Sequence, residues 1–435
     1  MGAEQAKGIS RRQFLTLVGA GSASLVAPAI LRADTLSGPD RPNIVVIVAD
    51  DLGYADLGVQ GCKDVPTPNI DSIGTNGVRF TNGYVSCPVC SPTRAGLQTG
   101  RYQQRFGHEF NPGPNVVGDF GLPLSEVTIG ERLKKAGYAT GFVGKWHLGT
   151  KPEMQPVKRG YDEFFGFLSG GRSYFFSEPL PYNSAILRGT QPVTEDTYLT
   201  DAFGREAAAF IRKHSDQPFF LMLCFNAVHT PLEVTDRYIN RFKNITDTKR
   251  RKMAAMLSAM DDAVGVALNA LRSTGVYDNT LIFFISDNGG PTASNASRND
   301  PLSGFKGQVL EGGIRVPFLV QWKRRIPAGR IYHHPVIALD IHPTCLAAAG
   351  VGAPRSGAKA LDGVDLLPYL EGRKSDAPHE WLFWRYGPQS AVRRGRWKLV
   401  RMEGKTQLFD LEADIAEKTD LYKQKPDIAR EMENA

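Results

Sequence analysis

The sequence is short of cysteine and lacks a strong excess of charge of one sign. It has five cysteines in 435 residues, and its formal net charge is +7. Residues 1–33 carry a surplus of three positive charges, which leaves the remainder with a formal charge of +4. A balance this mild does not indicate a nucleic-acid partner, although it would not repel an anionic substrate. The cysteines also lack the second closely spaced pair that a four-cysteine zinc site requires.

Internal repeats, low-complexity tracts and heptad patterns are absent as well, so the chain does not have the pattern of a solenoid or a coiled coil. After the first thirty or so residues, no run predicts a membrane-spanning helix in the mature chain. About 400 residues then remain, a length that suits one large domain with a smaller appendage.

The N-terminal segment has the features of an export signal. Ser10-Arg11-Arg12-Gln13-Phe14-Leu15 resembles a twin-arginine motif, and a mostly apolar run follows from Leu15 to Ile30. Leu31-Arg32-Ala33 then offers a small-residue cleavage point. We therefore expect a twin-arginine-type signal peptide over residues 1–33, and an exported mature protein that is periplasmic or extracellular. Its partner in export would be the twin-arginine machinery, which carries proteins that have already folded.

The rest of the chain alternates short buried strands with helical stretches, a pattern typical of an α/β fold with a mainly parallel sheet. The expected strands are apolar and rich in β-branched and aromatic residues, and they span 43–49, 139–144, 219–225, 280–285 and 316–320. Residues 128–136 and 252–272 have helical spacing, the second with a clear apolar stripe. We expect this large sheet, flanked by helices, to occupy residues 34–375.

The last sixty or so residues differ in character. Residues 390–400 are typical of two short strands around a turn, 407–411 of a further strand and 426–434 of a helix. We expect a small antiparallel sheet packed with a helix over residues 376–435. A structural role, as a lid or a flank, is the favoured interpretation of this subdomain.

Polar side chains follow four of the predicted strands at their downstream ends. Because the carboxyl ends of parallel strands meet at one edge of a sheet, we expect these side chains to lie in a single crevice. They belong to Asp50-Asp51, Lys145-Trp146-His147, His229-Thr230-Pro231 and Asp287-Asn288-Gly289-Gly290.

The acidic members of this group suggest a metal site. Asp50, Asp51, Asp287 and Asn288 offer three carboxylates and one amide oxygen, a set that suits calcium or magnesium better than zinc or copper. Helix capping is the plainer role for an acid at a strand end, and Asp51 alone could be no more than that. Two adjacent acids facing an Asp-Asn pair would repel one another without a cation between them. A hard cation at this edge is therefore the better interpretation.

The most informative segment is Cys90-Ser91-Pro92-Thr93-Arg94-Ala95-Gly96-Leu97-Gln98-Thr99-Gly100. Pro92 is pre-organised for the first turn of a helix, which would place Cys90 at a helix N-terminus, where an anion is favoured. Arg94 follows one turn later on the same face. The pair Cys87 and Cys90 could instead be a redox or disulfide motif, but that interpretation explains neither Pro92 nor Arg94. Apart from Cys90, two disulfides are possible and their pairing stays open among Cys62, Cys87, Cys224 and Cys345.

This segment resembles the nucleophile signature of the formylglycine-dependent (type I) sulfatases of the alkaline phosphatase superfamily. Trp397-Lys398-Leu399 and Phe409-Asp410-Leu411 resemble the C-terminal subdomain of that family. The similarity covers nearly the whole mature chain and implies an alkaline-phosphatase-like α/β core. Other family blocks occur in the family's order, at Gly137-Tyr138-Ala139-Thr140, Gly144-Lys145-Trp146-His147-Leu148-Gly149, His229-Thr230-Pro231, Asp287-Asn288-Gly289-Gly290, Gly304-Phe305-Lys306 and Glu311-Gly312-Gly313-Ile314-Arg315-Val316-Pro317.

The resemblance implies a sulfatase in which a maturation enzyme converts Cys90 to formylglycine, an aldehyde whose hydrate attacks sulfate esters. It also implies a bound Ca²⁺, with Mg²⁺ the less favoured ion. The implied metal ligands are an oxygen of the modified Cys90 together with Asp50, Asp51, Asp287 and Asn288.

The resemblance assigns catalytic roles to five further residues. Arg94 and Lys145 would neutralise and orient the hydrated aldehyde and the sulfate. His147 would hydrogen-bond one hydroxyl of the hydrate and later remove its proton. His229 and Lys306 would hold the sulfate and help the leaving oxygen to depart.

These residue types make chemical sense for hydrolysis of a sulfate monoester. The ester is anionic, so its charge must be neutralised before an anionic attacker can approach, and cations and a metal do this in a dry cleft. A geminal diol can attack sulfur through one oxygen. When a base takes the proton from the other oxygen, the covalent sulfate is expelled and the aldehyde is restored.

The substrate is the least defined feature. Residues 100–111 and 169–177 are expected at the rim of the cleft, where loops set specificity, and their aromatic and Arg side chains suit a sulfated sugar. A sulfate ester of a carbohydrate, either an oligosaccharide or a small molecule, is therefore the expected substrate. Two alternatives stay open: a phosphonate monoester or phosphodiester hydrolase of the same superfamily, and a catalytically silent carbohydrate-binding protein in which Cys90 remains a thiol.

Overall fold

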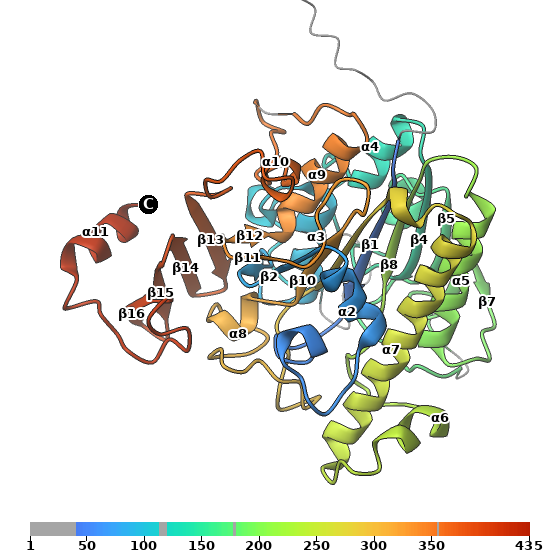
Figure 1. Ribbon diagram of the computed structural model, residues 1–435, viewed down its shortest axis with the longest axis horizontal. Helices are drawn as coiled ribbons and strands as arrows, with labels where there is room; N and C mark the ends of the chain where they lie inside the picture. Colours follow the sequence, from blue (N-terminus) through green and yellow to red (C-terminus); the bar gives the residue numbers. More distant parts are fainter. Residues whose placement is uncertain (1–40, 113–119, 177–179, 355) are drawn as a thin grey trace, which may run out of the picture. The chain divides into compact units, whose positions relative to one another are not determined.

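The computed structural model describes residues 41–112, 120–176, 180–354 and 356–435. The signal peptide predicted over residues 1–33 lies outside these ranges. The central feature is a ten-stranded sheet with the order β11-β2-β10-β9-β1-β8-β4-β5-β6-β7 (Figure 1). Its strands are β1 (Asn43–Ala49), β2 (Val78–Phe80), β4 (Ala139–Lys145), β5 (Glu163–Phe167), β6 (Ile186–Arg188), β7 (Gln191–Val193), β8 (Phe219–Cys224), β9 (Thr280–Ser286), β10 (Phe318–Gln321) and β11 (Arg330–Tyr332). A small parallel pair joins β3 (Gly83–Tyr84) to β12 (Val336–Ile337).

The middle of this sheet is parallel, as predicted. β1 pairs in parallel with both β8 and β9, and β4 lies in parallel between β8 and β5. Every residue of β1, β8 and β9 is buried, which is why these strands are almost continuously apolar in the sequence. The strand predicted at 316–320 is present as β10, but it runs antiparallel to β9. The mostly parallel α/β fold is confirmed.

Helices cover both faces of the sheet. Successive residues of β1 point to opposite faces, so Ile44 and Val46 lie in one core and Val45 and Ile47 lie in the other. The first core includes residues of α3, α4 and α9, and the second includes residues of α2, α5 and α7. The helices are α2 (Pro68–Thr75), α3 (Cys90–Thr99), α4 (Ile129–Lys135), α5 (Leu199–Lys213), α6 (Asp236–Ile239), α7 (Thr248–Ser273), α8 (Glu311–Ile314), α9 (Ile341–Ala348), α10 (Leu367–Leu370) and α11 (Pro426–Asn434).

Helix α7 corrects one expectation from the sequence. Within the described residues, this 26-residue helix is long and apolar enough to cross a membrane by length and composition, a property that was not predicted from its sequence. However, 83% of its most apolar window is buried inside the protein, where α7 packs with α5 and α2. Its composition is therefore explained by its place in the core, because a helix that is apolar on most sides must be covered by other elements.

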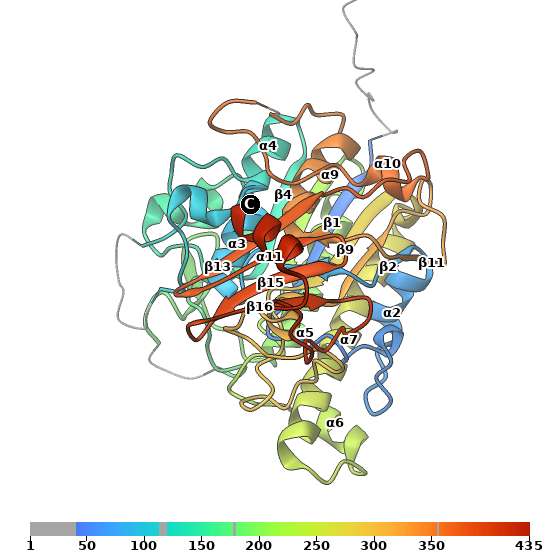
Figure 2. The same cartoon turned by 90° about the vertical axis from the view of Figure 1, so that its left-hand side faces the viewer.

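The C-terminal residues form the expected antiparallel sheet and helix. The strands β13 (Trp381–Tyr386), β14 (Gln389–Arg394), β15 (Trp397–Met402) and β16 (Lys405–Asp410) follow one another in that order (Figure 1). Helix α11 lies against this sheet (Figure 2). Ala429 and Met432 of α11 pack on Val392 and Leu399 of this sheet. Strand β13 was not predicted. It attaches the sheet to the main core, because the indole of Trp384 donates a hydrogen bond of 2.7 Å to the carbonyl of Val85. The predicted domain boundary at residue 376 stays a prediction.

Buried charges also join the C-terminal sheet to the main core. Lys398 of β15 lies with Nζ 2.8 Å from Glu311 Oε1 and 2.8 Å from Glu417 Oε1, and all three side chains are buried. Glu311 is the first residue of α8 and also accepts a hydrogen bond of 2.6 Å from the hydroxyl of Tyr84. Burial acts to raise the pKa of Glu311, but the neighbouring cations, chiefly Lys398 and Arg315, lower it to about 2. Glu311 is therefore a carboxylate whose charge depends on Lys398.

Replacement of this shared cation should destabilise the protein. We expect Lys398→Met to lower the free energy of unfolding by about 3–5 kcal/mol, because it leaves two buried carboxylates without their common partner. The midpoints of thermal and urea unfolding measure the effect. Lys405→Met, at an exposed position of β16, is the matched control and should change stability by less than about 0.5 kcal/mol. Unfolding midpoints that are the same for Lys398→Met and wild type would contradict a stabilising role for the cluster.

Candidate active site

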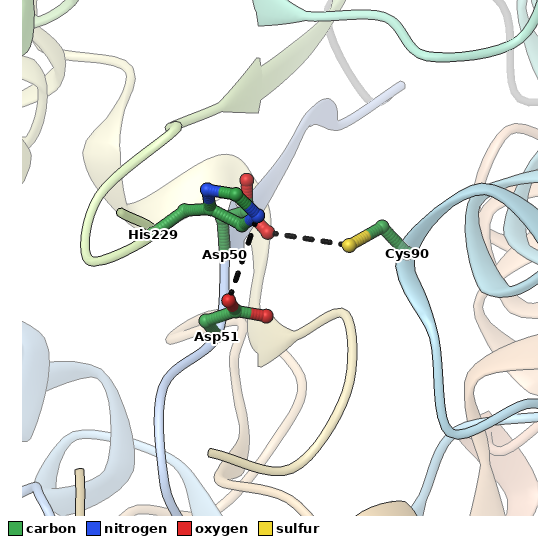
Figure 3. A group of neighbouring side chains, drawn as sticks. All are labelled: Asp50, Asp51, Cys90 and His229. Atoms are coloured by element: carbon green, nitrogen blue, oxygen red, sulfur yellow. Dashed lines mark hydrogen bonds and ion pairs between the residues drawn. The ribbon is translucent and has the colours of Figure 1, made fainter. Parts of the chain in front are cut away.

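Side chains from several distant segments converge at the carboxyl edge of the sheet. Some of these side chains lie at or directly after the ends of β1, β4 and β9. Helix α3 contributes two more side chains, and the loop after β8 and the loop before α8 contribute one side chain each. Figure 3 shows four of them, with the thiol of Cys90 and the ring of His229 directed toward the two adjacent aspartates. The structure thus brings together the residues predicted from the sequence, which are Asp50, Asp51, Cys90, Arg94, Lys145, His147, His229, Asp287, Asn288 and Lys306.

Cys90 is the first residue of α3, as the position of Pro92 predicted. Its Sγ lies 3.6 Å from Asp50 Oδ1, and its side chain is only 1% exposed. Burial, together with the carboxylate of Asp287, raises the pKa of the Cys90 thiol to about 12. Cys90 is therefore a neutral thiol here, whereas nucleophilic cysteines are normally thiolates.

Three cations neutralise three carboxylates around this helix start. Lys145 Nζ lies 2.6 Å from Asp50 Oδ2, and Lys306 Nζ lies 2.6 Å from Asp51 Oδ1. The guanidinium of Arg94 donates two hydrogen bonds, of 3.0 and 2.8 Å, to Asp287 Oδ2. Burial acts to raise the pKa of Asp50, but the ammonium of Lys145, followed by His229, outweighs it and the pKa lies below its ordinary value. Each of the three acids thus lies beside its own cation.

Oxygen atoms of the acids and of Asn288 form a possible cation site. Asn288 donates from Nδ2 to Asp51 Oδ1 at 2.7 Å, which leaves its own Oδ1 buried with no hydrogen-bond partner in the described part of the chain. Buried polar atoms are nearly always paired, so this oxygen is suited to be a metal ligand. Asp51 itself has a left-handed backbone conformation, with φ of 63°.

Among acidic, cysteine and histidine side chains, the cluster of ligand atoms lacks one predicted acid and contains one residue that was not predicted as a ligand. Atoms of Asp50, Asp51, Cys90 and His229 lie within 4.8 Å of one another. Asp287 was predicted as a ligand, but it is not part of this cluster and its Oδ2 is bound by Arg94. His229 was not predicted as a ligand; its Nε2 lies 3.7 Å from Asp51 Oδ2.

His229 presents one free nitrogen to the site. Its Nδ1 lies 2.6 Å from the carbonyl oxygen of Thr230, and because a carbonyl can only accept, Nδ1 carries the proton. The remaining nitrogen, Nε2, faces Asp51 and the pocket and can accept or hold a second proton. The backbone of His229 is fixed by the hydroxyl of Tyr174, which donates to its carbonyl at 2.8 Å.

His147 lies deeper than His229. It is buried, has a left-handed φ of 58°, and its Nδ1 has no hydrogen-bond partner among the described residues. Burial lowers the pKa of His147 well below its ordinary value, and the positive charge of Lys145 lowers it further. Gly170 packs directly on the ring, since a Cβ at this position would come within 2.5 Å of His147 Nε2. A larger residue at position 170 could not allow this close approach.

A pocket of about 370 Å³ opens beside these side chains. Cys90, His147 and His229 lie in its wall, together with Asn111 and residues 169–171. The two loops expected at the rim, 100–111 and 169–177, therefore both reach it. A larger pocket of about 540 Å³ lies along β4, β5 and α5, and contains none of the predicted site residues. We assign the chemistry to the smaller pocket, because Cys90, His147 and His229 line it.

Residues that support the start of α3 were not predicted from the sequence. The backbone N–H of Ser91 donates to Asn111 Oδ1 at 2.8 Å, which satisfies one of the free amides at the helix N-terminus. The hydroxyl of Ser91 lies 2.6 Å from the carbonyl of His147 and 2.7 Å from His108 Nε2. The one signal in the sequence was that Asn111 belongs to the loop expected at the rim of the cleft, and this did not predict its hydrogen bond.

All five cysteines lie in the described ranges and are free thiols. Cys87 and Cys90 are not joined, although they are separated by only two residues. Cys224 is buried in the core at the end of β8. Neither of the two disulfides that the sequence left open is formed.

Comparison with known proteins identifies the family. The Sulfatase family matches residues 42–351, and the family described as N-sulphoglucosamine sulphohydrolase, C-terminal, matches residues 305–434. The chain is 35% identical to N-acetylgalactosamine-6-sulfatase of Homo sapiens over 366 residues, which cover 78% of this chain and 68% of the human protein.

Solved structures agree with this result. Ps i-CgsB in complex with k-i-k-neocarrahexaose is 39% identical, with a TM-score of 0.84, over 90% of this chain and 91% of that chain. The PsFucS1 sulfatase from Pseudoalteromonas sp. is 26% identical, with a TM-score of 0.78, over 91% of this chain and 89% of that chain. The protein is therefore a sulfatase and belongs to the formylglycine-dependent (type I) sulfatase family.

Proposed function

We propose that this sulfatase hydrolyses sulfate monoesters of carbohydrates, with residue 90 acting as formylglycine. The observation that carries the proposal is the position of Cys90, at a helix N-terminus that opens into the pocket and faces three cation–carboxylate pairs. A neutral cysteine thiol is a weak nucleophile at such a position. The charges around it are instead suited to an oxygen nucleophile and an anionic substrate.

Formation of this residue requires a separate maturation enzyme. The conversion is a two-electron oxidation of the Cys90 side chain in which water supplies the aldehyde oxygen, sulfur leaves as hydrogen sulfide, and an oxidant used by the maturation enzyme takes up the two electrons and two protons. In its hydrated form, the aldehyde supplies an oxygen nucleophile and a second hydroxyl through which the sulfate can later be expelled, so that the enzyme passes through a covalent sulfo-enzyme state.

Arg94, Lys145 and His147 surround the proposed nucleophile. Arg94 and Lys145 would hold the negative charge of the sulfate close to residue 90, and their carboxylate partners already fix where the two cations lie. His147 is neutral and buried, with an unpartnered Nδ1. A neutral imidazole can accept a proton, so His147 would take the proton from the second hydroxyl of residue 90.

His229 and Lys306 would serve the other side of the sulfate. Lys306 would bind a sulfate oxygen. Burial acts to lower the pKa of its ammonium, but the nearby carboxylates of Asp51 and Asp50 raise it, so the group stays charged. His229 would donate a proton from Nε2 to the leaving oxygen, because its Nδ1 is held by the carbonyl of Thr230. Its position at the pocket wall, more exposed than His147, suits contact with the leaving group.

Calcium is the cofactor that this site suits best. Asp50, Asp51 and the free Oδ1 of Asn288 would hold it together with an oxygen of residue 90, and Asp287 would join them if Arg94 shares its carboxylate. All are hard oxygen donors, which calcium prefers and magnesium accepts less readily outside octahedral sites. A divalent cation there would supply positive charge next to the reacting oxygen and so lower the energy of the charged transition state.

The substrate is proposed to be a sulfated sugar. The human relative is named for N-acetylgalactosamine-6-sulfate, and the related Ps i-CgsB structure contains a neocarrahexaose. In this chain the pocket wall includes the uncharged polar residues Ser169, Asn183 and Ser184. Such groups suit the hydroxyls of a sugar. Export through the twin-arginine route, signalled by residues outside the described ranges, would bring the folded enzyme to polymers outside the cytoplasm.

The state of residue 90 is the first prediction. In active protein from the native organism, mass spectrometry of the tryptic peptide Phe80–Arg94 should find an aldehyde at residue 90 and an unchanged thiol at Cys87. Cys90→Ala should lower turnover by roughly 10⁴-fold or more, because no nucleophile remains. Cys62→Ala, which removes a free cysteine outside the site, should retain activity. An intact thiol at residue 90 in active protein would refute the proposal.

The role of His229 gives the second prediction. His229→Ala should lower kcat by roughly 10²–10⁴-fold for an alkyl or sugar sulfate, which needs protonation of its leaving oxygen. The loss should be much smaller for para-nitrophenyl sulfate, whose leaving group departs without a proton. His334→Ala removes an exposed histidine outside the site and should leave both rates unchanged. Equal losses on both substrates would exclude His229 as the general acid.

Metal dependence gives the third prediction. Treatment with a chelator should lower both activity and the midpoint of thermal unfolding, and added Ca²⁺ should restore both, because an ion that binds only the folded state stabilises it. Asn288→Ala removes the free oxygen and should raise the Ca²⁺ concentration needed for half of the thermal shift by on the order of 10-fold or more. Asn244→Ala, at an exposed position, is the control. An unfolding midpoint unaffected by either chelator or Ca²⁺ would argue against the site.

A further inference from the structure

An exposed aromatic ring, that of Phe110, contacts a half-buried one, that of Tyr386, beside the sulfate pocket. Phe110 is 52% exposed and directly precedes Asn111, which lies in the pocket wall and binds the start of α3. Its ring centroid is 6.0 Å from that of Tyr386, the last residue of β13. Single exposed aromatic residues are common, but two rings in contact at the edge of a polar pocket are not explained by core packing.

The position of Tyr386 is fixed by contacts on both sides. On one side, the guanidinium of Arg385 binds both carboxylate oxygens of Glu109 at 2.8 Å, which ties the end of β13 to the residue before Phe110. On the other side, Gln389 of β14 donates from Nε2 to the carbonyl of Gly307 at 3.0 Å and accepts from the N–H of Val309 at 3.2 Å. The hairpin between β13 and β14 is therefore anchored to the loop that carries Lys306.

Tyr386 also lies near the reacting groups. It ends the strand whose hairpin is held by Gln389 to the carbonyl of Gly307, the residue that follows Lys306. Burial raises the pKa of the Tyr386 phenol. The phenol has no hydrogen-bond partner among the contacts found within the described residues, although the ring is half-buried. Phe110 is exposed and Tyr386 is half-buried, so the pair presents ring surface to solvent next to Asn111 of the pocket wall.

We propose that Phe110 and Tyr386 form a carbohydrate-stacking subsite, which binds the sugar ring next to the sulfated unit and makes the enzyme prefer sulfated oligosaccharides to small sulfate esters. This inference rests on the proposed function of the pocket and extends it to a second sugar. The C–H face of a pyranose is apolar and packs well on an aromatic ring, while its hydroxyls stay at the edge in water. A rigid pair of rings can provide this contact with little loss of side-chain entropy, because Tyr and Phe have few rotatable bonds.

The C-terminal sheet would then be part of substrate recognition. β13 supplies Tyr386, and β14 supplies the Gln389 bridge that holds the hairpin against the Lys306 loop. The subsite and the sulfate pocket would share one rigid wall, so that stacking of the neighbouring sugar helps to place the ester at residue 90.

The test compares an oligosaccharide with a small ester. Tyr386→Ala and Phe110→Ala are assayed on k-i-k-neocarrahexaose, on a chondroitin hexasaccharide that contains N-acetylgalactosamine 6-sulfate, and on para-nitrophenyl sulfate. For whichever hexasaccharide the wild type cleaves, we expect kcat/KM relative to para-nitrophenyl sulfate to fall by about 10-fold, mainly through KM. Tyr386→Trp keeps a stacking face and should restore most of the ratio. Phe383→Ala, which removes a ring that is 39% exposed on the same strand, should leave the ratio unchanged.

Binding separates this inference from the proposed function. Calorimetry with Cys90→Ala protein measures hexasaccharide affinity without turnover, and Tyr386→Ala in that background should weaken it by a similar factor. If the wild-type protein hydrolyses no sulfate ester, while hexasaccharide affinity still depends on Tyr386, the subsite stands and the proposed chemistry is rejected. An unchanged ratio, equal losses on all substrates, or failure of wild type to bind either hexasaccharide would overturn the subsite.

Discussion

The structure depends on mutual neutralisation of buried charge at the carboxyl edge of the sheet. Asp50 and Lys145 are both fully buried and lie 2.6 Å apart, and Arg94 and Asp287 are buried in the same way. Removal of such groups from water costs several kcal/mol for each ion, which only a close partner can offset. Each cation is therefore held wherever its carboxylate lies, and the carboxylates are held by the ends of buried strands. This fixed array of charge gives the site its order before any substrate binds.

The partners in these pairs are far apart in the sequence, and the register of the sheet brings them together. Lys145 and Asp50 are separated by 95 residues, and Arg94 and Asp287 by 193. Val48 of β1 lies opposite Ile285 of β9 and opposite Cys224 of β8, so the residues that follow these strands emerge at the same level. A shift of one residue in a central strand would turn its last side chains to the other face. Burial of both faces of β1 prevents such a shift, and the core thereby determines the geometry of the site.

This origin explains which features could be predicted from the sequence. Strands β1, β4, β8 and β9 were predicted within a residue of their ends, because a buried parallel strand is a short apolar run with polar residues after it. The start of α3 was predicted from Pro92. The direction of β10 was not, because an apolar run gives no direction. α7 was recognised as a helix but not as one with the composition of a membrane span, a difference that only its burial resolves.

Contacts between loops and across the C-terminal junction had no comparable signal. His108 and Asn111 support Ser91 through single hydrogen bonds that no spacing pattern predicts. The sequence motif of His229 also does not predict that its Nε2 faces Asp51, which follows because the Thr230 carbonyl holds the other ring nitrogen. The C-terminal sheet was expected to be only a lid or a flank. Its Lys398 instead binds Glu311, and Gln389 binds Gly307 and Val309, on the segment that follows Lys306.

The segment that carries Lys306 is thus held from two directions. On the side of the active site, Lys306 itself binds Asp51 after the end of β1. On the side of the C-terminal sheet, α8 begins at Glu311 in the buried cluster with Lys398 and Glu417. A lysine on an unsupported loop would sample many positions, and binding to Asp51 or to the substrate would then cost conformational entropy. Anchored on both sides, it can exchange one anionic oxygen for another without rearrangement of its backbone. The antiparallel sheet therefore belongs to the framework of the active site. Its contribution is to fix the position of Lys306, which the contacts of the main domain alone do not fix.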